Sequence, residues 1–423
     1  MVKKTKLNNG LRLVTKVLPN TQSVTVLILV GAGSRYESKE LNGISHFLEH
    51  MFFKGAKRYI NIKEVSEAID SVGGDFNAFT GKEYAGYYVK VAAEQIDVAV
   101  DVLSDMLINS RFDTKDIEKE RGVILEEYNM YQDTPMYQIG WDFEKLIFGD
   151  QPLGRDQVGT KELIDSVTQE QFLAYLRALY TPDNTVIAVA GNFDEQKLQK
   201  SLEELFVFSA DRQKKAYDFA PMLPLVRDQR VRLRNKKTEQ AHVVIGFPGY
   251  LDNSPRHYAA KLLAVILGGN MSSRMFLGVR EALGLAYYIS TTTDEYADIG
   301  TFSTNAGVSV ERIDMAISAI IAEYKLAAEK GVTEAELVKA KAFLKGKIIL
   351  RLEDSEEYSH LIGKFELLHG GSRSLEDIVK LIDAVKLEDV NATAVDLFKA
   401  EELRVAVIGP YDDEQRFEKL LIM

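Results

Sequence analysis

Residues 46–50 read His46-Phe47-Leu48-Glu49-His50, and no other stretch of the chain is as informative. On a helix, His46 and His50 lie one turn apart, so both imidazoles project from one face with Glu49 beside them. Two neutral imidazoles and a carboxylate are the groups that a catalytic zinc requires, as nitrogen ligands and as a base for the bound water. The alternative is a helix whose histidines are merely solvated or packed. The spacing predicts a metal-bearing helix over residues 42–53.

The length and composition of the chain limit the classes of protein to which it can belong. The chain has 423 residues, enough for two domains, and a net charge of −11, which argues against nucleic acid and anionic membranes as partners. Cysteine is absent, so a zinc ion would be held by histidine and carboxylate. The first ten residues resemble neither a signal peptide nor a transit segment, and the longest apolar stretch is strand-sized. We therefore expect a cytoplasmic protein.

A repeat organises the chain. Residues 164–167 resemble residues 382–385, and the apolar run 186–191 resembles the run 405–409. The offset is the same where the first pair begins and where the second pair ends, since 382 − 164 and 409 − 191 both give 218. The repeat predicts two homologous domains, over residues 1–208 and 229–423, joined by a charged, proline-containing linker over residues 209–228.

The elements expected in the first half alternate without a clean βαβ pattern. We expect strands over residues 23–30, 77–80 and 87–91, and helices over residues 42–53, 61–72, 94–108 and 113–131. This mixture predicts an α+β fold, in which each domain is a mostly antiparallel sheet packed with helices.

A catalytic zinc usually has three protein ligands, so a carboxylate on another element is expected. The helix over residues 113–131 carries Glu120 and Glu127, seven residues apart and on nearly one face, with Glu126 adjacent. From the residues alone, a solvated charged face explains this helix equally well.

The stretch 43–55, Gly-Ile-Ser-His-Phe-Leu-Glu-His-Met-Phe-Phe-Lys-Gly, resembles the active-site helix of the M16 metallopeptidases (pitrilysin, insulin-degrading enzyme, mitochondrial processing peptidase), with the inverted zincin spacing H-x-x-E-H. The length is that of the short-chain M16B type. In that family the third ligand is a Glu seventy-seven residues after the second His, which is Glu127 here. The resemblance implies that His46, His50 and Glu127 bind one zinc ion per chain. It also implies that Glu49 is the general base on zinc-bound water and that Glu120 acts from the outer shell.

The resemblance extends along the chain. Residues 73–80 look like the family's edge strand, where Asn77, Ala78 and Phe79 would bind a peptide as an added strand. Residues 280–287 are similar to the family's Arg/Tyr motif, which implies that Arg280 and Tyr287 hold substrate. The second half has no metal motif, and the histidines at 242, 257, 360 and 369 are isolated in sequence.

Together these features predict a zinc-dependent endopeptidase that cleaves short or unstructured peptides inside a closed chamber. Short M16 chains carry half of the clamshell that long members build, so a homodimer is the simplest assembly, with Arg280 and Tyr287 of one chain facing the zinc of the other. The alternatives are a non-catalytic scaffold subunit and a peptide-binding module without turnover. The preference for zinc over manganese or cobalt rests on the family.

Overall fold

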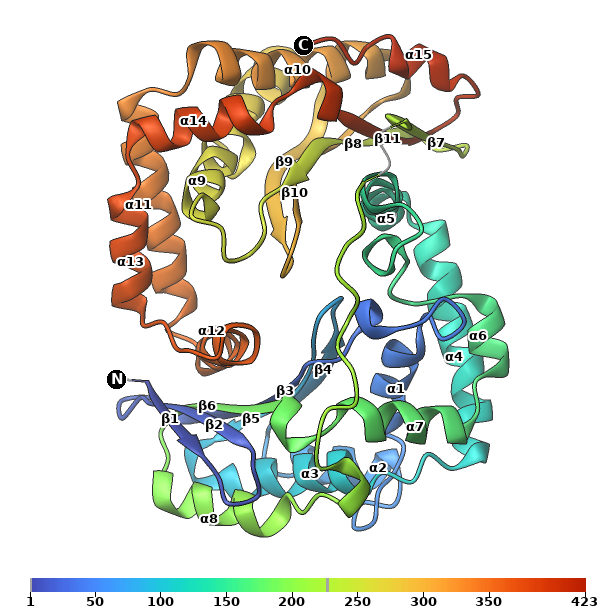
Figure 1. Cartoon of the computed structure of the whole chain (residues 1–423), viewed down its shortest axis with the longest axis vertical. Coiled ribbons are helices and arrows are strands. Elements are labelled where there is room, and N and C mark those ends of the chain that lie inside the picture. The colour runs from blue at the N-terminus through green and yellow to red at the C-terminus, as the bar shows by residue number, and fades with distance from the viewer. Residues whose placement is uncertain (1, 226–227) are drawn as a thin grey trace. The chain divides into compact units, whose positions relative to one another are not determined.

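The computed structural model describes residues 2–225 and 228–423, which form two compact units (Figure 1). The first unit contains residues 2–128, 156–220 and 349–375. The second contains residues 129–155, 221–225, 228–348 and 376–423. Each unit is thus assembled from stretches that are far apart in the sequence.

The first unit is a six-stranded sheet with helices on its faces. Its strands follow the order β1-β2-β6-β3-β5-β4, in which β2 and β6 are parallel and the other neighbours antiparallel. The strands are β1 (Lys3–Lys6), β2 (Arg12–Val17), β3 (Ser23–Val30), β4 (Asp75–Thr80), β5 (Ala85–Ala92) and β6 (Thr185–Gly191). The helices are α1 (Ile44–Phe52), α2 (Ile62–Asp70), α3 (Ile96–Asn109), α4 (Thr114–Asp133, up to residue 128), α6 (Lys161–Ser166), α7 (Gln169–Leu179), α8 (Glu195–Leu205) and α12 (Ser355–His369).

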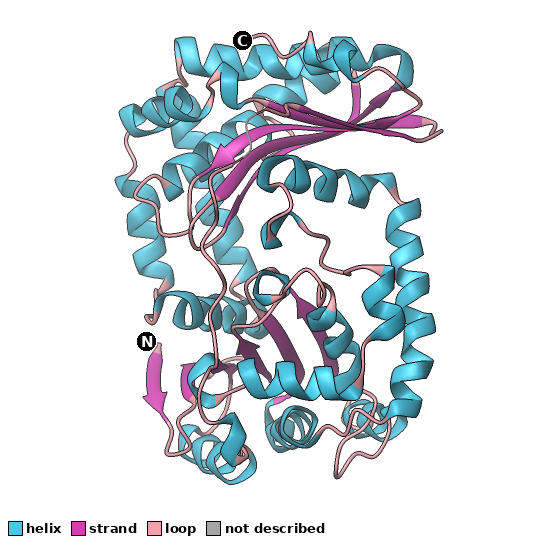
Figure 2. Cartoon of the chain, turned by 45° about the vertical axis from the view of Figure 1, so that its right-hand side comes forward, coloured by secondary structure: helices cyan, strands magenta, loops and turns pink. Residues whose placement is uncertain are grey.

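The second unit repeats this topology. Its five strands follow the order β7-β11-β8-β10-β9, which is the order of β2-β6-β3-β5-β4, and β7 and β11 are again parallel. The strands are β7 (Val231–Asn235), β8 (Gln240–Gly249), β9 (Ala286–Glu295), β10 (Gly300–Ser309) and β11 (Arg404–Gly409). The helices are α5 (Pro135–Phe148), α9 (His257–Gly268), α10 (Ile313–Lys330), α11 (Glu334–Arg351, up to residue 348), α13 (Leu375–Ala384), α14 (Leu387–Leu397) and α15 (Glu414–Glu418), with a π-helix, η6 (Phe276–Ala282). Figure 2 shows helices flanking the strands of both sheets.

Both faces of the first sheet are buried. Along β3, Val24, Val26 and Ile28 point into the core that includes α3, whereas Leu27 and Leu29 point to the other face and pack against α12. This alternation follows from the two-residue period of a strand, and the burial of both faces explains why β3 is apolar throughout.

Each sheet receives a helix from the other half of the sequence. The first sheet is covered by α12, which lies in the C-terminal half, and the second by α5, whose Ile139, Phe143 and Ile147 pack on β8 and β11. Each of these helices therefore covers a sheet encoded by the other half of the sequence. The sequence pattern does not predict this, because an amphipathic helix does not specify which sheet it will cover.

The α+β fold class predicted from the sequence is confirmed, as are two sheet-and-helix domains. The strand predicted at residues 23–30 coincides with β3, and the helix predicted at 42–53 is observed as α1. The helix predicted at 61–72 is α2, whose end is followed by Gly73 at φ +65° as a left-handed cap. In the predicted linker, residues 226–227 lie outside the described residues, and of the others only Ala210–Arg212 form a short helical turn. The domain limits drawn from the repeat stay a prediction.

Gly363 should report on the packing of α12. A methyl group there would lie 2.7 Å from Leu29 Cδ1 and 2.9 Å from Ala188 Cβ, so we expect Gly363→Ala to destabilise the protein by about 1–3 kcal/mol. The matched control is Gly346→Ala in α11, where a methyl group meets open space and should stabilise by about 0.5–1 kcal/mol. Chemical denaturation monitored by circular dichroism measures both, and a gain in both variants would contradict the packing.

Candidate metal centre

The helix α1 presents two different faces. Ile44, Phe47, Leu48 and Met51 are buried in the core, and the other side carries the histidines and Glu49. The helix begins after Gly43, which has φ +106° and approaches Gly159 so closely that a Cβ on Gly43 would lie 2.6 Å from the Gly159 Cα. Only glycine fits there, so the start of α1 is fixed against the segment before α6.

A buried carboxylate holds the first turn of α1, and the sequence analysis missed it. Glu37 accepts hydrogen bonds from the backbone N–H groups of Gly43 (2.7 Å) and Ser45 (2.9 Å) and from the side chain of Asn42 (3.0 Å). Burial raises the pKa of Glu37, and these three donors counteract that rise. An acidic residue six positions before the N-cap glycine, Gly43, is the signal that could have revealed this interaction, because helix N-termini favour negative charge.

The three predicted ligands meet in the structure. His46 Nε2 lies 3.6 Å from Glu127 Oε1, and His50 Nε2 lies 3.3 Å from Glu127 Oε2. Ligands bonded at about 2.0–2.1 Å to one tetrahedral ion are separated by about 3.3 Å. The side chains of His46, His50 and Glu127 are 12%, 21% and 24% exposed, so the group is shielded yet reachable.

Glu120 forms a second layer behind His50. Its Oε1 lies 3.0 Å from His50 Nδ1 and its Oε2 lies 2.7 Å from Lys54 Nζ, with only 3% of the side chain exposed. Because Glu120 occupies Nδ1, the Nε2 of His50 is left to face Glu127. This is the arrangement expected of an outer carboxylate that fixes the tautomer of a ligating histidine.

The charges at this cluster favour a cation. Burial acts to lower the pKa of His50, but contacts with Glu120, Glu127 and Glu49 outweigh it and raise that pKa to about 9. The contacts with His46 and His50 in turn lower the pKa of Glu127. The carboxylates thus favour positive charge at His50, and a divalent ion can supply that charge in place of a proton. The residues present therefore fit a zinc ion.

Glu49 is positioned by a residue that the sequence analysis did not single out. The Thr80 hydroxyl lies 2.5 Å from Glu49 Oε2 and donates a hydrogen bond to it. Thr80 is the last residue of β4, so this contact links the edge strand to α1. A hydroxyl at a strand end gives no recognisable sequence signal.

The predicted peptide-binding residues lie on β4, which is an edge of its sheet. Among the described residues β4 pairs only with β5, so its other side offers backbone donors and acceptors. Asn77 is exposed, Ala78 packs on the core beside α1, and the Phe79 ring lies 5.1 Å from that of His360 on α12.

Comparison with known proteins places the chain in a family. Residues 12–160 match the insulinase (peptidase family M16) domain, and residues 166–344 match the peptidase M16 inactive domain. An uncharacterized zinc protease of Streptomyces coelicolor is 39% identical over 98% of this chain and 91% of its own length. The uncharacterized zinc protease YmxG of Bacillus subtilis is 38% identical over 97% and 98%. The chain belongs to peptidase family M16.

Solved structures share the fold of this M16 chain. A protease from Helicobacter pylori superposes with a TM-score of 0.88 at 21% identity, covering 97% of this chain and 99% of that one. A peptidase M16 inactive domain from Pseudomonas fluorescens gives 0.88 at 17%, covering 98% and 99%. These structures share the fold, and the sequence matches above confirm the family resemblance inferred from residues 43–55.

The Arg280 and Tyr287 of this M16 chain lie in the second unit, each at an irregularity of the backbone. Arg280 belongs to the π-helix η6, and its guanidinium lies 4.5 Å from the centre of the Phe276 ring. Tyr287 is 74% exposed on the edge strand β9, where Ala286 and Tyr288 pair with Val308 and Gly307, so Tyr287 is the extra residue of a β-bulge. π-Helices and bulges commonly re-aim side chains at functional sites.

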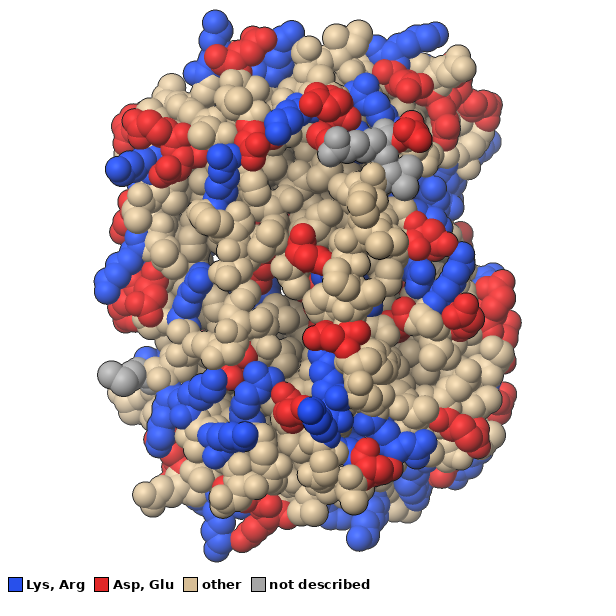
Figure 3. Space-filling view, viewed as in Figure 1, with Lys and Arg blue, Asp and Glu red and all other residues tan. Residues whose placement is uncertain are grey.

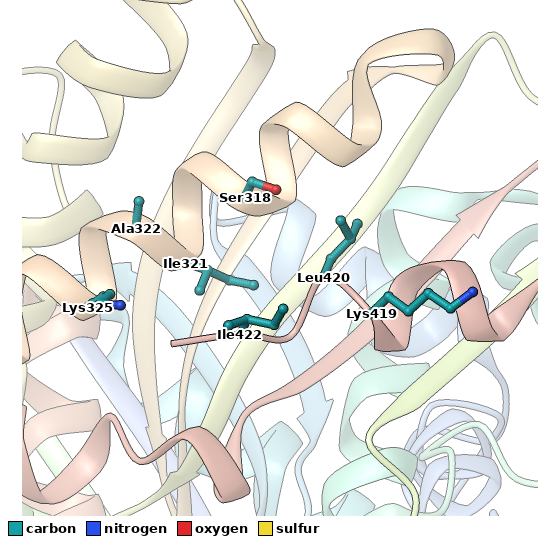
Figure 4. Close-up of a pocket in the computed structure, with 7 residues that line it drawn as sticks. All are labelled: Ser318, Ile321, Ala322, Lys325, Lys419, Leu420 and Ile422. Atoms are coloured by element: carbon teal, nitrogen blue, oxygen red, sulfur yellow. The ribbon is translucent and has the colours of Figure 1, made fainter.

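A depression on the M16 chain has a different, largely apolar lining. A depression of about 250 Å³ between α10 and the C-terminal residues is lined by Ser318, Ile321, Ala322, Lys325, Lys419, Leu420 and Ile422 (Figure 4). Figure 3 shows Lys and Arg side chains interspersed with Asp and Glu on the face viewed. Within the described residues, no helix combines the length and apolarity needed to cross a bilayer.

The neighbours Glu126 and Glu127 allow a sharp test of the ligand set. We expect Glu127→Gln to weaken zinc binding by at least 100-fold, because an amide is a poor zinc ligand, whereas Glu126→Gln, on the exposed side of α4, should bind zinc as the native protein does. Isothermal titration of the metal-free proteins measures both affinities. Equal affinities for the two variants would refute Glu127 as a ligand.

Proposed function

We propose that this M16 chain is a zinc-dependent endopeptidase that hydrolyses short or unstructured peptides. The observation that carries the proposal is the convergence of His46, His50 and Glu127 on one point, with Glu49 beside them. The curated relatives named zinc proteases match over nearly their whole lengths, which supports the same activity here. One catalytic zinc ion per chain would be held by the two imidazoles and the Glu127 carboxylate.

The chain's own residues account for the proton transfers. When bound, zinc supplies a Lewis acid that polarises the scissile carbonyl and lowers the pKa of water. Glu49 is the general base: its carboxylate takes a proton from the attacking water and passes it to the leaving amine. The hydrogen bond from Thr80 holds Oε2 of Glu49 in place, which leaves Oε1 as the oxygen that exchanges the proton.

The form of β4 supports extended peptides as substrates. A peptide that adds to the open edge of β4 would pair through its main chain, next to the strand end where Thr80 contacts Glu49. Such pairing requires an extended segment with free backbone groups, which folded proteins rarely present. Asn77, Ala78 and Phe79 would then lie along the bound chain, as the family resemblance implies.

We also propose that the active assembly is a homodimer enclosing a chamber, in which Arg280 and Tyr287 of one chain bind the substrate at the metal centre of the other. A guanidinium and a phenol suit carboxylate and carbonyl oxygens. The exposure of Tyr287 and the irregular backbone at both residues support a binding role over a packing role.

The general base is tested by Glu49→Gln. The zinc-loaded variant should cleave a quenched-fluorescent unstructured peptide about 10²–10⁴-fold more slowly than the native chain while keeping its zinc, because only proton transfer is lost. Mass spectrometry of the products identifies cleavage. The control Glu126→Gln, an identical change on the exposed side of α4, should cleave normally.

If the zinc-loaded native chain binds peptides of several sequences but cuts none of them, the protein is a peptide-binding or scaffold member of the family. If Glu49→Gln cleaves as fast as the native chain, another group is the base.

The cross-chain site is tested by mixing two inactive variants. Arg280→Ala and Glu49→Gln should each be nearly inactive alone. After dissociation and reassembly in equal amounts, half the dimers are mixed and one of their two sites has an intact Glu49 and Arg280, so about a quarter of native activity should return. Activity that stays at the level of the separate variants would place the pair within one chain or outside the site.

A further inference from the structure

A second cluster of metal-binding side chains lies in the second unit. Asp252 follows β8, His257 is the first residue of α9, and Glu295 is the last residue of β9. Nδ1 of His257 lies 3.8 Å from Oδ1 of Asp252 and 3.8 Å from Oε1 of Glu295, and one ligand atom of each residue lies within 4.8 Å of the other two. His257, which looked isolated in sequence, is therefore not isolated in space.

The three side chains are shielded from water. They are 12% (Asp252), 14% (His257) and 8% (Glu295) exposed, less than Glu127 of the candidate metal centre. Two carboxylates brought this close to each other in a dehydrated setting repel, and a cation between them removes that cost. The donor set of one imidazole and two carboxylates contains the same kinds of atoms as the first centre.

Backbone hydrogen bonds outside the cluster fix the frame that carries these residues. The N–H of Asp252 donates to the carbonyl of Tyr296 (2.9 Å), and the N–H of His257 donates to the carbonyl of Ser254 (3.1 Å). The turn after β8 is thereby tied to the end of β9. A site built on such a frame keeps its ligand spacing without the ion.

Glu295 is oriented so that one oxygen faces the histidine. Lys261, one turn along α9 from His257, lies 2.9 Å from Oε2, and the Thr293 hydroxyl donates to Oε1 at 2.7 Å. A carboxylate oxygen has two lone pairs, so Oε1 can accept from Thr293 and still ligate an ion. Partners of this kind position metal-binding carboxylates.

His257 is the first residue of the twelve-residue helix α9, so the helix start anchors its side chain. Its Nδ1 lies between one oxygen of Asp252 and one oxygen of Glu295. An imidazole nitrogen flanked by two carboxylate oxygens is a donor arrangement that divalent transition ions bind.

We propose that Asp252, His257 and Glu295 form a second metal site, which binds a divalent transition ion such as Zn²⁺. Atoms with the observed separations lie about 2.1–2.5 Å from a common point, within reach of zinc after a small adjustment. The imidazole selects such ions over Mg²⁺ and Ca²⁺, which prefer all-oxygen sites. The ion would cross-link the turn after β8, the start of α9 and the end of β9, and the proposal is independent of peptidase activity.

Counting bound zinc tests the proposal. The full-length chain is stripped with a chelator, reloaded with Zn²⁺, dialysed and analysed by inductively coupled plasma mass spectrometry. We expect two zinc ions per native chain, one in His257→Ala, one in His50→Ala and none in the double variant. The control His369→Ala removes an exposed histidine at the end of α12 and should keep two.

One zinc ion per native chain with none in His50→Ala would overturn the second site. One zinc ion that is lost in His257→Ala but kept in His50→Ala would instead overturn the first centre, so the two proposals fail separately. If circular dichroism shows His257→Ala to be unfolded, Asp252→Asn and Glu295→Gln replace it, and each should lower the count by one. X-ray absorption of zinc-loaded His50→Ala should show one nitrogen and carboxylate oxygens; any other donor set refutes the assignment.

Discussion

The concentration of negative charge around His50 is the constraint on which the rest of the site depends. Glu120, Glu127 and Glu49 all act on this imidazole, and burial alone would have shifted its pKa in the opposite direction. Such a cluster is stable only with a positive charge at its centre, supplied by protons or by a metal ion. The surrounding structure keeps the groups together: Glu37 holds the first turn of α1, Lys54 balances Glu120, and Thr80 fixes Glu49.

The part of the structure that follows from local pattern could be predicted from the sequence. The apolar periodicity and the turn residues predicted β3, α2 and the β4–β5 hairpin. The one-turn spacing of His46 and His50 predicted that both side chains lie on one face of α1. The choice of Glu127 as the candidate third ligand required the family resemblance, because Glu120, Glu126 and Glu127 are the same residue type and only their packing distinguishes them. Glu37 and Thr80 escaped detection, since their roles arise from contacts between elements rather than from a period along the chain.

The two units show how one topology can carry two kinds of site. Five strands of the first sheet and the five of the second follow the same order, and among the described residues the last strand of each sheet has one neighbour. In the first unit that edge ends at Thr80, which contacts Glu49. In the second, the edge strand carries a bulge at Tyr287 and ends at Glu295, beside Asp252 and His257. The shared fold thus places sheet-edge strands and helix N-termini at equivalent positions in the two units, and the side chains at those positions determine the chemistry.

The late position of α12 in the sequence affects how the chain can fold while it is being synthesised. The first sheet is encoded by residue 191, yet α12, which covers Leu27, Leu29 and Val186, begins only at residue 355. A nascent chain therefore carries an uncovered apolar sheet face while the 164 residues from 191 to 355 are added, a state prone to aggregation. The helix with both histidines belongs to a unit that is completed only at residue 375, so a chain terminated before α12 would lack one of the layers that support this helix.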